Sequence, residues 1–153
     1  MRKLGLTIMA SAAILLTACG EKTYEPHDIN HDTDICKICN MSIVHDDFAG
    51  QIIEKNGDYE VFDDIGCLVE KMQRDGLGEQ DIGAAFIKDA ETNEWINIFS
   101  ATYLYDKDFF TPMNYGVLVF NDEKEAQIYQ QQEGKGTLMK YQDLADFKWG
   151  IHQ

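Results

Sequence analysis

The sequence predicts an α+β fold of two small ββαβ-like lobes that follow a signal peptide and a flexible tether. Three observations support this prediction. The Asn56-Gly57 pair separates two apolar runs, which indicates a β-hairpin. Aspartates precede two segments with helical spacing, and glycines follow both segments. The order strand, strand, helix, strand occurs twice along the chain, although few residue identities link the two halves.

The first lobe is expected over residues 35–92. Its strands are predicted at 51–54, 59–62 and 84–87, with a turn at 89–93. Asp63 and Asp64 can cap a helix, and the glycines at 76 and 78 end it. Apolar residues at helical spacing place one face of this helix against the core: Ile65, Leu68, Val69 and Met72.

The second lobe is expected over residues 93–153. Extended segments are predicted at 95–99, 102–105, 116–120 and 137–139. Asn121 and Asp122 precede a helix that ends at Gly134 to Gly136. We expect this helix to pack inward through Ala126, Ile128 and Tyr129. A final helix is predicted over 141–147.

The N-terminus predicts a lipoprotein signal peptide over residues 1–18. Arg2 and Lys3 precede an apolar run, Leu4 to Leu16, which is shorter than the roughly 20 residues that a membrane-spanning helix needs. The run ends in Leu16-Thr17-Ala18-Cys19, which resembles a bacterial lipobox. Acylation of Cys19 would anchor the protein to the cell membrane on its extracytoplasmic side. The alternative is an ordinary secretory signal that leaves Cys19 as a free thiol.

Residues 19–34 are polar and lack hydrophobic periodicity, which is typical of a flexible tether. His27 and His31 are expected to be solvated there, and assistance in metal capture is the alternative. The formal charge of −14 becomes −16 when cleavage removes the two signal-peptide cations. Such a charge excludes nucleic-acid binding. It favours solubility or attraction of cations and of a basic partner.

Residues 36–41 place three sulfur side chains in six positions, namely Cys36, Cys39 and Met41. Thiolates and thioethers together favour Cu(I) over harder cations. If the segment is extended, Cys39 and Met41 point to the same side. A Cys-x-x-Cys pair also occurs in thiol–disulfide oxidoreductases and zinc sites. An extracytoplasmic oxidoreductase that uses Cys36 and Cys39 is therefore the alternative function, and structural zinc binding is the third.

A further thioether lies in the segment Thr111-Pro112-Met113, within a predicted turn. Because loops carry binding residues more often than cores do, we expect Met113 to be a copper ligand. Met72 and Met139 lie on predicted helix and strand faces and are expected to fill the core. His45 can add a nitrogen ligand if its segment is curled. No phosphate-binding glycine loop or Ser-His-Asp arrangement is present, so a hydrolase is not supported.

The lipobox, the segment Cys36 to Met41, the segment Phe62-Asp63-Asp64-Ile65-Gly66-Cys67 and Thr111-Pro112-Met113 together resemble NosL-type lipoproteins. This family comprises copper chaperones associated with the maturation of nitrous oxide reductase in denitrification. The resemblance implies two ββαβ-type lobes and a Cu(I) chaperone that is not an enzyme. It implies delivery to an ABC-type transporter or to apo nitrous oxide reductase.

Carried over by position, the resemblance implies that Cys39, Met41 and Met113 are the main copper contacts. Many relatives keep only the Cys-x-Met part of the motif, so the resemblance does not require Cys36, which follows the other three residues as a candidate ligand. Cys67 has two interpretations. It is either a small buried apolar residue of the first helix or the partner of Cys36 in a disulfide, which would leave Cys39 as the free thiolate.

Overall fold

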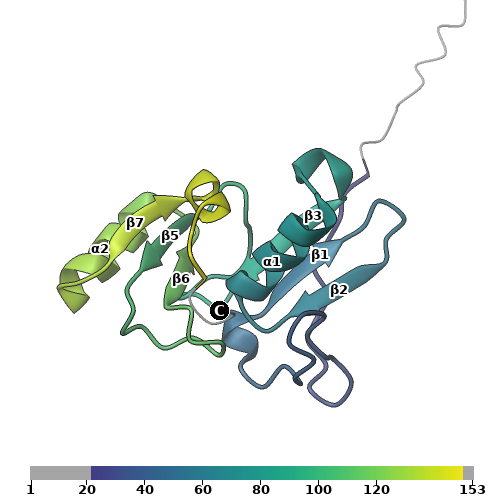
Figure 1. The fold of residues 1–153 in the computed structure, drawn as a ribbon, viewed down its shortest axis with the longest axis horizontal. Coiled ribbons are helices and arrows are strands. Elements are labelled where there is room, and N and C mark those ends of the chain that lie inside the picture. Colours follow the sequence, from purple (N-terminus) through teal and green to yellow (C-terminus); the bar gives the residue numbers. More distant parts are fainter. Residues whose placement is uncertain (1–21, 150–153) are drawn as a thin grey trace, which may run out of the picture.

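The computed structural model describes residues 22–149, which form two antiparallel sheets, each covered by one helix of 11 residues (Figure 1). The expected α+β class is confirmed. The signal peptide and Cys19 lie outside the described residues. Between residues 22 and 149, neither helix is long and apolar enough to cross a membrane.

The first sheet has the strand order β2-β1-β3-β4, and the second has the order β6-β5-β7. The first comprises β1 (Gly50–Ile53), β2 (Tyr59–Phe62), β3 (Ala84–Lys88) and β4 (Trp95–Asn97), with helix α1 (Ile65–Asp75). The second comprises β5 (Thr102–Tyr105), β6 (Val117–Phe120) and β7 (Thr137–Lys140), with helix α2 (Glu123–Glu133).

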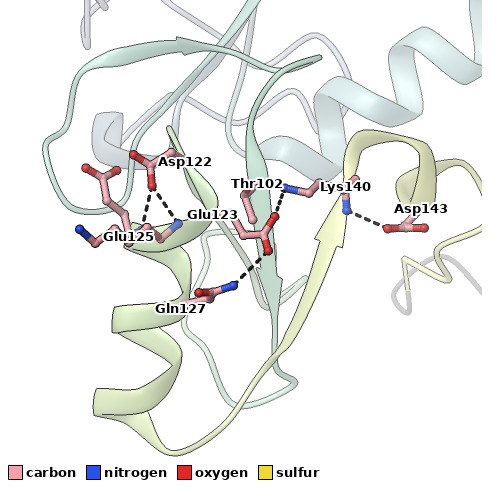
Figure 2. Close-up of polar contacts among 8 residues, drawn as sticks. Thr102, Asp122, Glu123, Glu125, Gln127, Lys140 and Asp143 are labelled. Carbon is pink, nitrogen blue, oxygen red and sulfur yellow. Dashed lines mark hydrogen bonds and ion pairs between the residues drawn. The ribbon is translucent and has the colours of Figure 1, made fainter.

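The two ββαβ units share one topology, which confirms the predicted repeat. In each unit the first strand is central, and the second and third strands pair with it on opposite sides. Asp64 caps α1 and Asp122 caps α2, because each side chain accepts the N–H groups two and three residues further on. Figure 2 shows this cap at Asp122. Each helix ends at a left-handed glycine, Gly76 or Gly134.

Three expectations for the second lobe need correction. Strand β4 pairs with β3, so the first sheet extends beyond the expected boundary between residues 92 and 93. The final helix is a 3-10 helix over Tyr141–Ala145 and does not reach residue 147. Ile128 is 45% exposed, whereas Ala126 is buried. Residues two apart lie on roughly opposite sides of a helix, so Ala126 and Ile128 cannot face the same core.

The segment from Lys22 to Asp34 lies against the first sheet. The buried Gln51 side chain accepts the N–H of His27 and donates to its carbonyl. The His27 ring stacks on Tyr59, with ring centroids 4.0 Å apart. Lys22 and Tyr24 donate to the carbonyl of Lys55. Residues 22–34 are therefore not the flexible tether that the sequence predicted. For residues 19–21, which lie outside the described range, the tether remains a prediction.

One hydrophobic core joins the two lobes. Met72 on α1 and Met139 on β7 belong to it and are 2% and 9% exposed, as the sequence predicted. Tyr103 of β5 is fully buried in the same core, and its hydroxyl donates to the carbonyl of Ile98. Because both lobes contribute to one packed core, their loops are held in a fixed relation to each other.

Candidate metal centre

Residues 36–41 form a tight loop and not the extended segment considered from the sequence. The Cys36 N–H donates to the Met41 carbonyl over 2.9 Å, and the Asn40 N–H donates to the Cys36 carbonyl over 3.0 Å. Asn40 has a φ of 59°, a left-handed conformation that asparagine tolerates better than most residues. The Lys37 N–H donates to the Val61 carbonyl. This bond docks the loop on β2.

Docking on β2 brings a third cysteine to the loop. Strand β2 leads through Asp63 and Asp64 into α1, whose first turn carries Cys67. The sulfur atoms of Cys36, Cys39 and Cys67 all lie within 4.8 Å of one another. We call these residues the three-thiol group. An ion bound at about 2.3 Å from three sulfurs needs them roughly 4 Å apart, so only a small contraction would close the group around a metal.

Cys36 is the residue of the group that most favours the thiolate form. Its pKa is lowered from 9.0 to about 5, chiefly by a hydrogen bond from the Cys67 thiol. Burial opposes this shift, and the backbone N–H groups of Cys39, Ile38 and Asp63 lower the pKa further. Cys36 is fully buried. When the three-thiol group loses its first proton, the negative charge therefore lies on Cys36, inside the protein and among hydrogen-bond donors.

The other two thiols retain their protons. Burial raises the pKa of Cys39 to about 11, although the Met41 N–H opposes the shift. Donation to Cys36 and burial raise the pKa of Cys67. Asp63 is only 3% exposed, and burial together with the Cys36 thiolate raises its pKa to about 6. The Cys36 thiolate and the Asp63 carboxylate therefore place negative charge at this site, which a bound cation would neutralise.

The three thiols and the two predicted thioether ligands lie at different depths in the protein. Cys36 and Cys67 are buried and Cys39 is partly exposed, whereas Met41 is 47% exposed. Met113 lies in the β5–β6 loop and packs, partly buried, against the core that contains Cys36 and Cys67. Its N–H donates to the Asp64 carboxylate over 3.2 Å. Cys36 and Cys67 are therefore the buried donors, and Cys39, Met41 and Met113 lie nearer the surface.

Histidines do not join the three-thiol group within residues 22–149. His31 lies 2.9 Å from the Ile43 carbonyl through Nδ1. The ring of His45 makes an edge contact with Phe110, with centroids 5.4 Å apart. A closed zinc site normally has four protein ligands, and the group supplies three.

Cys67 is the residue that sequence reasoning did not assign to the metal site. It is buried, as one interpretation expected, and the three described cysteines carry no disulfide. The predicted hairpin is the sequence signal that could have indicated that Cys67 lies near Cys36 and Cys39. Strand β2 ends three residues before the first turn of α1, so any contact between the cysteine loop and β2 places Cys67 beside that loop.

Comparisons with known proteins agree with this fold. The family model described as NosL matches residues 26–147. The chain is similar to a solved structure described as the copper chaperone NosL from Shewanella denitrificans, with a TM-score of 0.66. The two sequences are 16% identical, and the match covers 80% of this chain and 96% of the other. Curated protein sequences give no match. With four fifths of its length matched by the family model, the chain belongs to the NosL family.

Proposed function

We propose that this protein is a Cu(I) carrier, anchored through Cys19 to the extracytoplasmic face of the cell membrane. The three-thiol group supports this proposal most directly. Three sulfurs within 4.8 Å of one another form a soft donor set, with exposed Met41 and partly buried Met113 as further soft donors in the adjoining loops. Such donors select Cu(I) over magnesium, calcium or manganese.

The graded exposure of the sulfurs fits a carrier better than a storage site. Buried Cys36 and Cys67 would hold the ion, while partly exposed Cys39 is open to an incoming ligand. An acceptor can then bind the copper before the carrier has released all of its own ligands. For a member of the NosL family, the recipient we propose is an ABC-type transporter or apo nitrous oxide reductase.

The same geometry disfavours the alternative, a thiol–disulfide oxidoreductase. An attacking cysteine must be both accessible and ionised. Here Cys36 is ionised but fully buried, and Cys39 is accessible but has a pKa of about 11. Residues 36–41 form a loop that does not begin a helix, so no helix N-terminus stabilises a thiolate at Cys39.

Anaerobic titration with Cu(I) against a competing chelator tests the proposal. We expect one Cu(I) per chain, a large loss of affinity in Cys39→Ala and a smaller loss in Met41→Ala. Met139→Leu is the matched control, because Met139 is a buried core residue of β7. Full-strength binding by Cys39→Ala, or X-ray absorption with only nitrogen and oxygen neighbours around the copper, would refute the assignment.

A further inference from the structure

Asp64 has more hydrogen bonds than its role as a helix cap requires. Its carboxylate is only 1% exposed, and both oxygens accept backbone N–H groups. Oδ1 accepts from Gly66 over 2.9 Å and from Cys67 over 3.4 Å. Oδ2 accepts from Met113 over 3.2 Å. No lysine or arginine within residues 22–149 forms an ion pair with this carboxylate.

These bonds connect two soft donors that belong to different lobes. Cys67 lies in the first turn of α1, and Met113 lies in the loop between β5 and β6. One carboxylate therefore fixes the backbone at both positions. A carboxylate forms stronger hydrogen bonds with backbone N–H groups than a neutral acceptor does, so this contact can set where the loop lies.

The loop that carries Met113 is itself a closed turn. The buried Thr111 hydroxyl accepts the N–H groups of Tyr115 and Gly116 over 2.9 and 3.2 Å. The Asn114 N–H donates to the Thr111 carbonyl, and Asn114 has a left-handed φ of 57°. These bonds close the turn on itself, and the bond from the Met113 N–H to Asp64 connects it to the first lobe.

Two other aspartates serve as comparisons for Asp64. One of them only caps a helix, and the other connects the two lobes. Asp122 is the equivalent cap of α2, and among residues 22–149 its exposed side chain accepts only the N–H groups of Lys124 and Glu125 (Figure 2). Asp89 is buried and accepts the N–H groups of Glu91 and Thr92 in its own turn, and that of Asn121 across the lobes over 2.7 Å. Within residues 22–149, neither of these carboxylates accepts an N–H group from a cysteine or a methionine.

From this comparison we infer that Asp64 is a positioning residue of the copper site, which holds the Met113 thioether against the three-thiol group. The inference rests on the proposed function, since it assigns a role within Cu(I) binding. Asp64 acts through Met113 and does not itself bind the ion. Capping needs one carboxylate oxygen, since Oδ1 of Asp122 accepts both N–H groups of its helix. The bond from Met113 to Oδ2 of Asp64 is therefore additional to the cap.

The test is Asp64→Asn. Asparagine remains a good N-cap, but its Nδ2 group would face the Met113 N–H, so one acceptor is lost. We expect Cu(I) affinity to fall about tenfold, together with loss of the Met sulfur from the X-ray absorption spectrum of the copper. Asp89→Asn removes an acceptor between the lobes in the same way, and Asp122→Asn changes the equivalent cap. Both controls should keep wild-type affinity and spectrum.

A double-mutant cycle distinguishes positioning from a general effect on folding. In a Met113→Leu background, Asp64→Asn should change the affinity less than twofold. Equal losses with and without Met113, or wild-type affinity in Asp64→Asn, would overturn the inference. If Asp64→Asn does not fold, Asp64→Ser keeps a cap but is too short to reach Met113, and the same outcomes apply. Failure of the wild-type protein to bind Cu(I) would instead refute the proposed function.

Discussion

Copper binding to the three-thiol group should tighten steeply as the pH rises, because the ion must displace protons from two of the three sulfurs. Cys36 has a pKa of about 5 and is ionised near neutral pH. Cys39 has a pKa of about 11, and the pKa of Cys67 is raised as well, so both hold protons there. Metal ligation by cysteine requires the thiolate.

The expected slope follows from this count. Each copper ion replaces two protons, so the logarithm of the apparent affinity should rise by about two for each pH unit between about pH 7 and 8.5. The slope depends on which thiols hold protons and not on their individual pKa values. Asp63 and Asp64 have pKa values of about 6 and are mostly ionised in this window, so they add little to it.

Anaerobic competition with a Cu(I) chelator of known protonation measures the slope. Calorimetry in two buffers with different ionisation enthalpies counts the released protons independently. Cys67→Ser is the informative variant, since the hydroxyl can still donate to Cys36 but cannot become a thiolate ligand. Its slope should fall to about one, while Met139→Leu should retain the slope of two.

A wild-type slope near zero would refute binding by these thiols. A slope near one, unchanged in Cys67→Ser, would show that Cys67 keeps its proton and does not bind copper. The site would then consist of Cys36, Cys39 and the thioethers, as the sequence first suggested.

Two further predictions concern stability and anchoring. In the reduced, metal-free protein, the pKa of Asp63 is raised from 3.8 to about 6. The folded state therefore binds this proton more tightly than the unfolded chain does. The free energy of unfolding of the wild type, relative to Asp63→Asn, should rise by about 2 kcal/mol as the pH falls from 7 to 4. Urea denaturation measures this difference, and a constant value would contradict it. Cys19→Ser should abolish labelling by radioactive palmitate and release the protein from membranes, whereas Cys67→Ser should do neither.

Local sequence signals were sufficient for most of the secondary structure. The Asn56-Gly57 turn, the aspartate caps and the glycine stops each depend on residues close together in the chain, and all appear where expected. The repeat of two ββαβ units follows from the order of these elements. One error was the boundary between the lobes, which was placed inside the short turn that joins β3 to β4. Strand β4 joined the first sheet because β3 pairs with it.

The sequence by itself determined that this protein carries a sulfur-rich loop, because three soft donors in six residues have few other uses. Only the tertiary structure brought Cys67 to that loop and Met113 to the Asp64 carboxylate. Cys67 is separated from Cys39 by a β-hairpin, and Met113 lies in the other lobe. Contacts of this kind depend on how strands pair and how two lobes share a core, and no local pattern of residues encodes those distances.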